Sequence, residues 1–219
     1  AMEETSLLVH LQHVLTKPVI FTGAQFTADH DEADGPANLG RAIEMALDEQ
    51  NATKGVLLSF GGRSLPAWGL YKLSADAADA FRSARPLITD GALHLTASVA
   101  SQRVDIVAIH PGCEATHIDA SLQAGAKGIV LAALGSGNAN PLIAEAVKRC
   151  EDRGVPVVVS SRVPEGLLVA SYGGGGGGHD LVAAGAVHSS TLRPGQARIL
   201  LAALLASESA PEDIVSAFA

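Results

Sequence analysis

The feature that most constrains the fold is a regular alternation of apolar, strand-like runs with helical patterns in residues 104–206. The predicted strands are 104–109, 128–134 and 155–160, and the predicted helices are 118–124, 141–153 and 193–206. Continuous apolar strands separated by helices of about ten residues are typical of parallel sheets covered on both faces. This half of the chain therefore predicts an α/β fold.

The first half has a similar but less regular pattern. Strands are predicted at 18–22 and 55–60, and helices at 3–15, 38–50 and 76–84. In the second of these helices, Leu39, Ile43, Ala46 and Leu47 share one side, and Asn38 is a candidate cap. The stretch 85–103 alternates weakly, so we interpret it as the remnant of a hairpin followed by a linker.

The helix at 3–15 has no N-terminal capping residue, since only Ala1 and Met2 precede Glu3. A domain that starts with an uncapped helix is unusual, and this helix raises the question of what should precede it.

Composition and charge limit the partners and the compartment. The net charge is −8 and no Lys/Arg cluster occurs, which argues against nucleic acid and anionic membranes. No apolar run reaches the length of a membrane span, and the first residues lack the basic region of a signal peptide. Cys113 and Cys150 lack metal-ligand spacing and fit reduced thiols of a cytoplasmic protein. Two alternatives are left by the sequence, namely one disulfide between these cysteines and export of a longer form of the protein.

Three stretches could carry chemistry, and each has a simpler structural interpretation. The turn GSGN at 135–138 follows a strand and precedes a helix starting near Pro141, where open α/β sheets bind ligands; it is equally a tight strand-to-helix turn. Lys72 could handle protons, or be an ordinary surface lysine. TGAQ at 22–25 with EADGPANL at 32–39 forms either a substrate-shaping site or turns.

Other segments point to structure. The six glycines 173–178 predict a mobile loop without regular structure. In SSRVPEG at 160–166, Arg162 is expected to tie down a loop. The absence of a GxSxG elbow excludes a serine hydrolase of the α/β class.

Taken together, these stretches resemble the bacterial-type L-asparaginase (asparaginase/glutaminase) family. Over nearly the whole chain the family order is kept by the segments MEETSLLVHL, KPVIFTGAQ, EADGPANL, GLYKLSADAADAF, VDIVAIHPG, AGAKGIVLAALGSGN, VPVVVSSRVPEG and LRPGQARILL. The TGAQ segment departs from the family's TGAM at Gln25.

The resemblance implies hydrolysis of L-asparagine, with L-glutamine as a further substrate, through an acyl-enzyme formed on a threonine. Lys72 matches the family's catalytic lysine, and Ala24 the residue whose backbone carbonyl helps to hold the substrate amide. Asn138 matches the asparagine that a neighbouring subunit contributes to the site. A homodimer or tetramer is implied, and no metal or organic cofactor.

The family's GGTIA turn and GTDT motif, with its threonine nucleophiles, would precede residue 2, so the resemblance implies a truncated or mis-assigned reading frame. We therefore expect two flavodoxin- or Rossmann-like three-layer α/β domains with mainly parallel sheets, an incomplete one at 1–90 and a second at 104–219, joined by a linker at 91–103. We expect an asparaginase-type amidohydrolase that is inactive or nearly so. The alternative is a non-catalytic homologue serving as an oligomeric scaffold or a small amino-acid-binding module.

Overall fold

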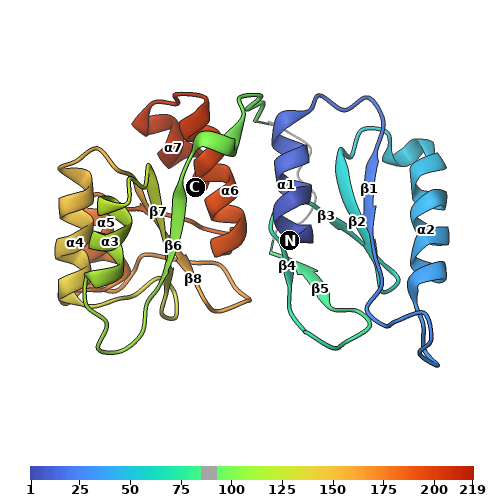
Figure 1. Ribbon diagram of the computed structural model, residues 1–219, viewed down its shortest axis with the longest axis horizontal. Helices are drawn as coiled ribbons and strands as arrows, with labels where there is room; N and C mark the ends of the chain where they lie inside the picture. The colour runs from blue at the N-terminus through green and yellow to red at the C-terminus, as the bar shows by residue number, and fades with distance from the viewer. Residues whose placement is uncertain (85–92) are drawn as a thin grey trace. The chain divides into compact units, whose positions relative to one another are not determined.

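The structure, a computed structural model, describes residues 1–84 and 93–219. The chain divides into two compact units, Ala1–Thr96 and Ala97–Ala219, each described here by itself (Figure 1). Most of the hairpin expected from residue 85, and the first residues of the expected linker, lie outside the described residues.

The first unit is an α/β unit around a short mixed sheet. Its elements are α1 (Met2–Gln12), β1 (Val19–Thr22), α2 (Gly35–Leu47), η1 (Glu49–Asn51), β2 (Val56–Phe60), β3 (Arg63–Pro66), β4 (Leu70–Lys72) and β5 (Phe81–Ser83). β1 pairs in parallel with β2, and Val19 lies opposite Val56. β2 pairs antiparallel with β3, and β4 and β5 form a separate antiparallel hairpin. Helices α1 and α2 lie on opposite faces of the β1–β2 pair (Figure 1).

The prediction of a helix at 76–84 is wrong. Ser74 Oγ accepts hydrogen bonds from the backbone N–H groups of Asp76 and Ala77, which forms a turn instead. Phe81 then pairs with Lys72 in the hairpin and packs edge-on against Phe60, with ring centroids 5.0 Å apart. Tertiary packing of one aromatic side chain thus outweighs the helix propensity of the alanines around it.

The first helix lacks a side-chain cap, as predicted, but it ends at Gln12 rather than at residue 15. Ser6, Leu7 and Leu11 are buried, whereas Val14 is 75% exposed. The carbonyl of Leu11 accepts a hydrogen bond from the backbone N–H of Leu95 instead of continuing the helix.

Helix α2 buries a different face from the one predicted. Asn38, Ala42 and Met45 are buried, while Leu39, Ile43 and Leu47 are 54%, 52% and 78% exposed. Asn38 is not the cap, because Asp34 holds that position. The inward face is set by the Asn38 side chain, which makes hydrogen bonds to the ends of β1 and β2 described below.

The second unit is a three-layer α/β unit with a fully parallel sheet in the order β6-β7-β8-β9. Its elements are η2 (Val99–Ser101), β6 (Val104–Ala108), α3 (Thr116–Gln123), β7 (Gly128–Ala133), α4 (Pro141–Glu151), β8 (Val157–Ser161), α5 (Gly178–Ala183), β9 (Val187–His188), α6 (Pro194–Ala206) and α7 (Pro211–Phe218). The three predicted strands and three predicted helices are confirmed, and every end agrees to within two residues. Helices α5 and α7 and strand β9 are additional. The α/β fold class is confirmed.

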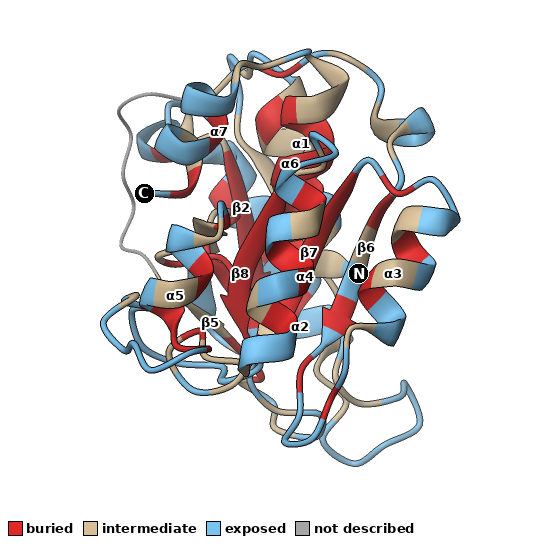
Figure 2. Ribbon diagram, turned by 90° about the vertical axis from the view of Figure 1, so that its left-hand side faces the viewer, coloured by how far each residue is buried: buried red, intermediate tan, exposed pale blue. Residues whose placement is uncertain are grey.

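The core of this unit lies on both sides of its central strands. Strands β7 and β8 are buried over almost their whole length (Figure 2). Ile118, Ile143 and Leu181 from α3, α4 and α5 form one apolar cluster with Ile129 and Leu131 of β7. Helix α6 packs on the opposite face, where a side chain at Gly128 would collide with Leu201. Across the described residues, no helix is long and apolar enough to cross a membrane.

Candidate functional site

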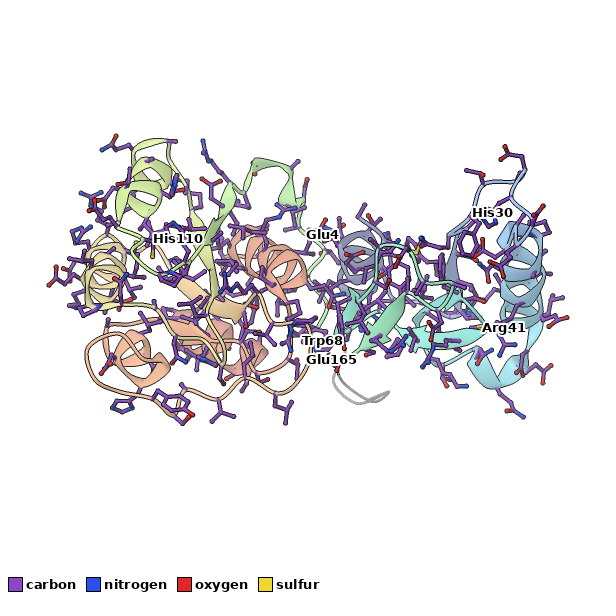
Figure 3. All side chains as sticks on the ribbon, turned by 90° about the horizontal axis from the view of Figure 1, so that it is seen from below. Glu4, His30, Arg41, Trp68, His110 and Glu165 are labelled. Carbon is purple, nitrogen blue, oxygen red and sulfur yellow. The ribbon has the colours of Figure 1, made fainter. Side chains whose placement is uncertain are left out.

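The turn at the end of β1 is held by the carboxylate of Asp34. Its Oδ1 accepts from the backbone N–H groups of Gln25 and Phe26, both at 3.0 Å, and its Oδ2 accepts from Asn38 Nδ2 at 2.9 Å. Desolvation acts to raise the pKa of Asp34, but the N–H groups of Phe26 and Gln25 stabilise the charged form and lower it below the ordinary value. In the same loop, His30 (labelled in Figure 3) stacks on Phe26, and the ring centroids are 4.7 Å apart.

Asn38 joins this turn to the end of β2. Its Nδ2 also donates to the carbonyl of Gly23 at 2.9 Å, and its Oδ1 accepts from the N–H of Gly61 at 3.2 Å. Because Gly23 and Gly61 follow neighbouring parallel strands, one side chain fixes both strand ends. The EADGPANL segment thus shapes the carboxyl edge of this sheet.

Lys72 meets the same turn from the hairpin. Its Nζ donates to Oε1 of Gln25 at 3.0 Å, and Nε2 of Gln25 donates to the carbonyl of Ala75 at 2.6 Å. Nζ also lies 5.6 Å from the centroid of the Phe81 ring. Lys72 is exposed, so its ammonium group is available to a ligand.

Ala24 is exposed between these anchored residues. Among the described residues, its carbonyl accepts no hydrogen bond. The structure therefore brings Lys72 and the Ala24 peptide, 48 positions apart in the chain, to one end of β1. A free carbonyl beside a lysine ammonium can bind a carboxamide, since the carbonyl accepts from the amide N–H and the lysine supplies a proton.

Replacing Gln25 with methionine, the residue of the family's TGAM segment, should free the Lys72 side chain. Methionine has no oxygen to accept from Nζ, and it leaves the carbonyl of Ala75 without its donor. We expect the NMR order parameter of the Lys72 ammonium to fall, while that of Lys54, whose Nζ donates to Asn51 Oδ1 at 2.8 Å, stays unchanged. An unchanged Lys72 order parameter would show that Gln25 does not hold it.

Asn138 belongs to the second unit, in the turn between β7 and α4. The turn is closed by hydrogen bonds in both directions between the backbones of Leu134 and Asn138. Gly137 has φ +99°, and a Cβ there would collide with Nε2 of His188, so glycine is required. The Asn138 Oδ1 accepts from the N–H of Gly178 at 3.1 Å. Within the part of the chain that is described, its Nδ2 has no acceptor.

The start of α4 near Pro141 is confirmed, and Asn140 caps it. Asn140 Oδ1 accepts from the N–H of Ile143 at 3.1 Å, and its Nδ2 donates to the carbonyl of Cys113 at 2.8 Å. Cys113 and Cys150 are buried and unpaired. Burial raises the pKa of the Cys150 thiol to about 11.

The glycine run has neither helix nor strand over residues 173–177, as predicted. Oδ2 of Asp180 accepts from the N–H groups of Gly175, Gly176 and Gly177 at 2.8, 2.8 and 2.9 Å. Gly178 begins helix α5. No local sequence signal marks Asp180 as an organising residue, since it follows the run by two positions and lies in an unremarkable helical segment.

The loop after β8 is tied down by Arg193, not by Arg162. Arg162 is exposed, whereas Arg193 is 8% exposed and donates to the carbonyls of Pro164 and Gly166 at 2.9 and 2.6 Å. Sequence proximity suggested the wrong arginine, because α6 brings Arg193 to the loop from 27 residues downstream.

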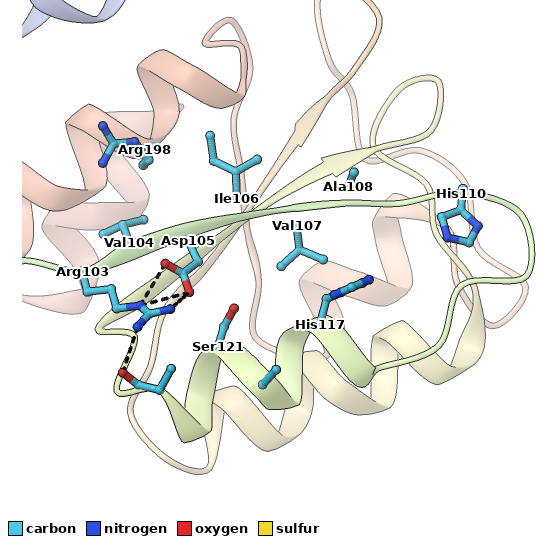
Figure 4. A pocket seen from close by; sticks show the side chains of 12 residues that line it. Arg103, Val104, Asp105, Ile106, Val107, Ala108, His110, His117, Ser121 and Arg198 are labelled. Carbon is cyan, nitrogen blue, oxygen red and sulfur yellow. Dashed lines mark hydrogen bonds and ion pairs between the residues drawn. The ribbon is translucent and has the colours of Figure 1, made fainter.

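A shallow groove of about 840 Å³ runs along the edge strand β6 and helix α3 (Figure 4). Its main polar contact is internal, because the guanidinium of Arg103 makes three hydrogen bonds to the carboxylate of Asp105, at 2.9–3.2 Å. Lys72, Ala24 and Asn138 do not line it. The groove is therefore separate from the residues singled out by sequence.

Two family models match the chain. The model described as "Asparaginase, N-terminal" matches residues 1–100, and "Glutaminase/Asparaginase C-terminal domain" matches residues 103–218. The probable L-asparaginase of Deinococcus radiodurans is 33% identical, over 99% of this chain and 71% of its own length. The probable periplasmic L-asparaginase of Haemophilus influenzae is 30% identical, over 99% of this chain and 66% of its own length.

A similar solved structure is that of a probable cytoplasmic L-asparaginase from Campylobacter jejuni. It has a TM-score of 0.87 and 26% identity, and the match covers 99% of this chain and 71% of that one. The chain thus spans about two thirds of the length of the relatives it matches.

Proposed function

The chain belongs to the glutaminase/asparaginase family, and on this premise we propose that it supplies the lysine and the substrate-shaping turn of an amidohydrolase site for L-asparagine. One observation carries the proposal, namely the hydrogen bond between Lys72 Nζ and Gln25. Gln25 is adjacent to Ala24, whose carbonyl has no donor within residues 1–84 and 93–219. This hydrogen bond joins the TGAQ segment to the segment of Lys72, and the counterparts of both segments in the family take part in the hydrolysis of L-asparagine.

In that reaction a hydroxyl oxygen attacks the side-chain amide carbon of asparagine and its proton passes to the leaving nitrogen. Ammonia departs and leaves an ester, which water hydrolyses to L-aspartate and the free hydroxyl. Lys72 would take part in the proton transfers, and the Ala24 carbonyl would accept from the amide N–H and orient it. L-Glutamine, longer by one methylene, is the proposed second substrate.

The 219-residue chain alone should release little or no ammonia. Lys72 contacts Gln25 and Phe81, and neither side chain is a nucleophile. The family resemblance places the threonine nucleophiles ahead of the segment that matches residues 2–11. Loss of a nucleophile costs several orders of magnitude in rate.

The test is ammonia release from L-asparagine by the purified chain, compared with Lys72→Ala prepared in parallel. We expect both to stay at the background rate. Turnover by the chain that Lys72→Ala abolishes would contradict this expectation, since it would require a nucleophile within the 219 residues.

The position of Asn138 supports self-association as part of the proposal. Its Nδ2, which has no acceptor among the residues that the structure describes, is a donor suited to a carboxylate, and the resemblance assigns Asn138 to the site of a neighbouring subunit. We propose a dimer or tetramer on the strength of this resemblance, and sedimentation equilibrium would measure it. The two buried, unpaired cysteines fit our further proposal of a reducing, cytoplasmic compartment.

A further inference from the structure

The carboxylate of Asp180 occupies the hollow formed by three consecutive backbone N–H groups of the glycine run. Its Oδ2 accepts from Gly175, Gly176 and Gly177, and these hydrogen bonds are charge-assisted. The N–H groups of Gly176, Gly177 and Gly175 lower the pKa of Asp180 below its ordinary value, so it is ionised at neutral pH. Glycine loses more conformational entropy on ordering than any other residue, so this run needs such an anchor.

The glycine run makes hydrogen bonds and close packing contacts with the segment 138–140. The carbonyl of Gly176 accepts from the N–H of Ala139 at 2.8 Å. Gly176 also lies directly on Asn140, since a Cβ on Gly176 would be 2.5 Å from the Asn140 backbone. At the end of the run, the N–H of Gly178 donates to Oδ1 of Asn138.

The last of these contacts decides which way the Asn138 carboxamide faces. With Oδ1 bonded to Gly178, Nδ2 is directed away from the run and has no acceptor among the described residues. If the run loosened, the carboxamide could rotate, and its donor would no longer be presented in one direction.

We propose that Asp180 is a positioning residue that orients the Asn138 side-chain amide through the Gly175–Gly178 backbone. The inference rests on the proposed function only for the role of Asn138 toward a substrate carboxylate. The orientation itself depends on contacts within this chain. It assigns a task to hydrogen bonds that the glycine run makes with Asp180 and Asn138.

The test compares the Asn138 side-chain ¹H–¹⁵N signals of the full chain with those of Asp180→Asn and Asp180→Ala. We expect both variants to shift these signals and to lower the order parameter of the Asn138 side chain. Asp180→Glu, which keeps a carboxylate, should lower that order parameter less than either of them. Asp152→Asn is the matched control, an exposed aspartate of the same unit paired with Lys148 at 3.1 Å, and it should leave Asn138 unchanged. The side chain of Asn51, which donates to the carbonyl of Met45 in the other unit, provides an internal reference.

Unchanged Asn138 signals in folded Asp180→Ala would overturn the inference. If that variant does not fold, Asp180→Asn takes its place, because it removes the negative charge that strengthens the three hydrogen bonds. Unchanged Asn138 signals in Asp180→Asn would then overturn the inference. A separate measurement tests the substrate role of Asn138, using an active chimera that carries the leading third of the Deinococcus radiodurans relative. There we expect Asp180→Asn to raise the KM for L-asparagine about tenfold with a smaller change in kcat. Altered Asn138 signals without a KM change would keep the positioning inference and refute the role of Asn138 in the proposed function.

Discussion

Replacing Arg193 with alanine is expected to lower the free energy of unfolding of the second unit by about 2–4 kcal/mol. The guanidinium is almost fully buried and donates to the carbonyls of Pro164 and Gly166. Removing it leaves these carbonyls without their donor and opens a cavity at the start of α6. Each buried polar group left unpaired costs about 1–3 kcal/mol.

Arg162→Ala is the matched control, since Arg162 is exposed on the same loop. We expect it to change the stability by no more than about 0.5 kcal/mol. Arg193→Lys should recover only part of the loss, because an ammonium lacks the planar fork that reaches two carbonyls at once. Hydrogen exchange of the β7 and β8 amides reports on this unit directly. Equal protection in Arg193→Ala and Arg162→Ala would contradict the assignment.

The parts of the fold that could be predicted are those governed by local pattern. The buried strands β6, β7 and β8 are continuous apolar runs, and the helices between them carry their own start signals, such as Pro141. The short strands β3, β4 and β5 could not be predicted from local pattern. Strand β3 is stabilised by pairing with β2 across the turn Gly61–Gly62, and β4 and β5 by pairing with each other and by the packing of Phe81. Helix α5 begins within the glycine run, where propensity argues against a helix.

In the candidate site, too, local motifs could be predicted and the tertiary contacts that hold them could not. The motifs around Ala24, Lys72 and Asn138 could be found in the sequence, and Lys72 and the Ala24 turn lie together in the structure. The residues that hold them were not predicted. The sequence indicates only a turn at Asp34, and Asp180 acts on Asn138 across 42 positions of sequence. The face of α2 was mispredicted for a related reason, since the hydrogen bonds of Asn38 override the apolar side that holds Leu39 and Ile43.

Loss of Lys72 is expected to have a large effect on kcat once the nucleophilic threonines are supplied by a related protein. We expect a chimera, with the leading third of the Deinococcus radiodurans relative joined ahead of residue 1, to release ammonia from L-asparagine. That relative is 33% identical to this chain, which covers 71% of its length, so the added segment meets a similar fold. Lys72→Ala in the chimera should reduce kcat by about 10²–10⁴-fold, the usual contribution of positioned proton transfer.

Lys54→Ala is the matched control, because Lys54 lies in the same unit and donates to Asn51 rather than to the β1 turn. It should leave kcat unchanged. Circular dichroism and the oligomeric mass of each variant separate loss of chemistry from loss of folding.

The rate of ammonia release by this chimera, with and without Lys72, is therefore the most direct test of a catalytic role for this chain. We predict turnover of L-asparagine that Lys72→Ala reduces by at least about a hundredfold and Lys54→Ala does not. A folded chimera that is inactive, or one whose turnover is indifferent to Lys72, would contradict the claim that this chain supplies the lysine and the substrate-shaping turn of an asparaginase site.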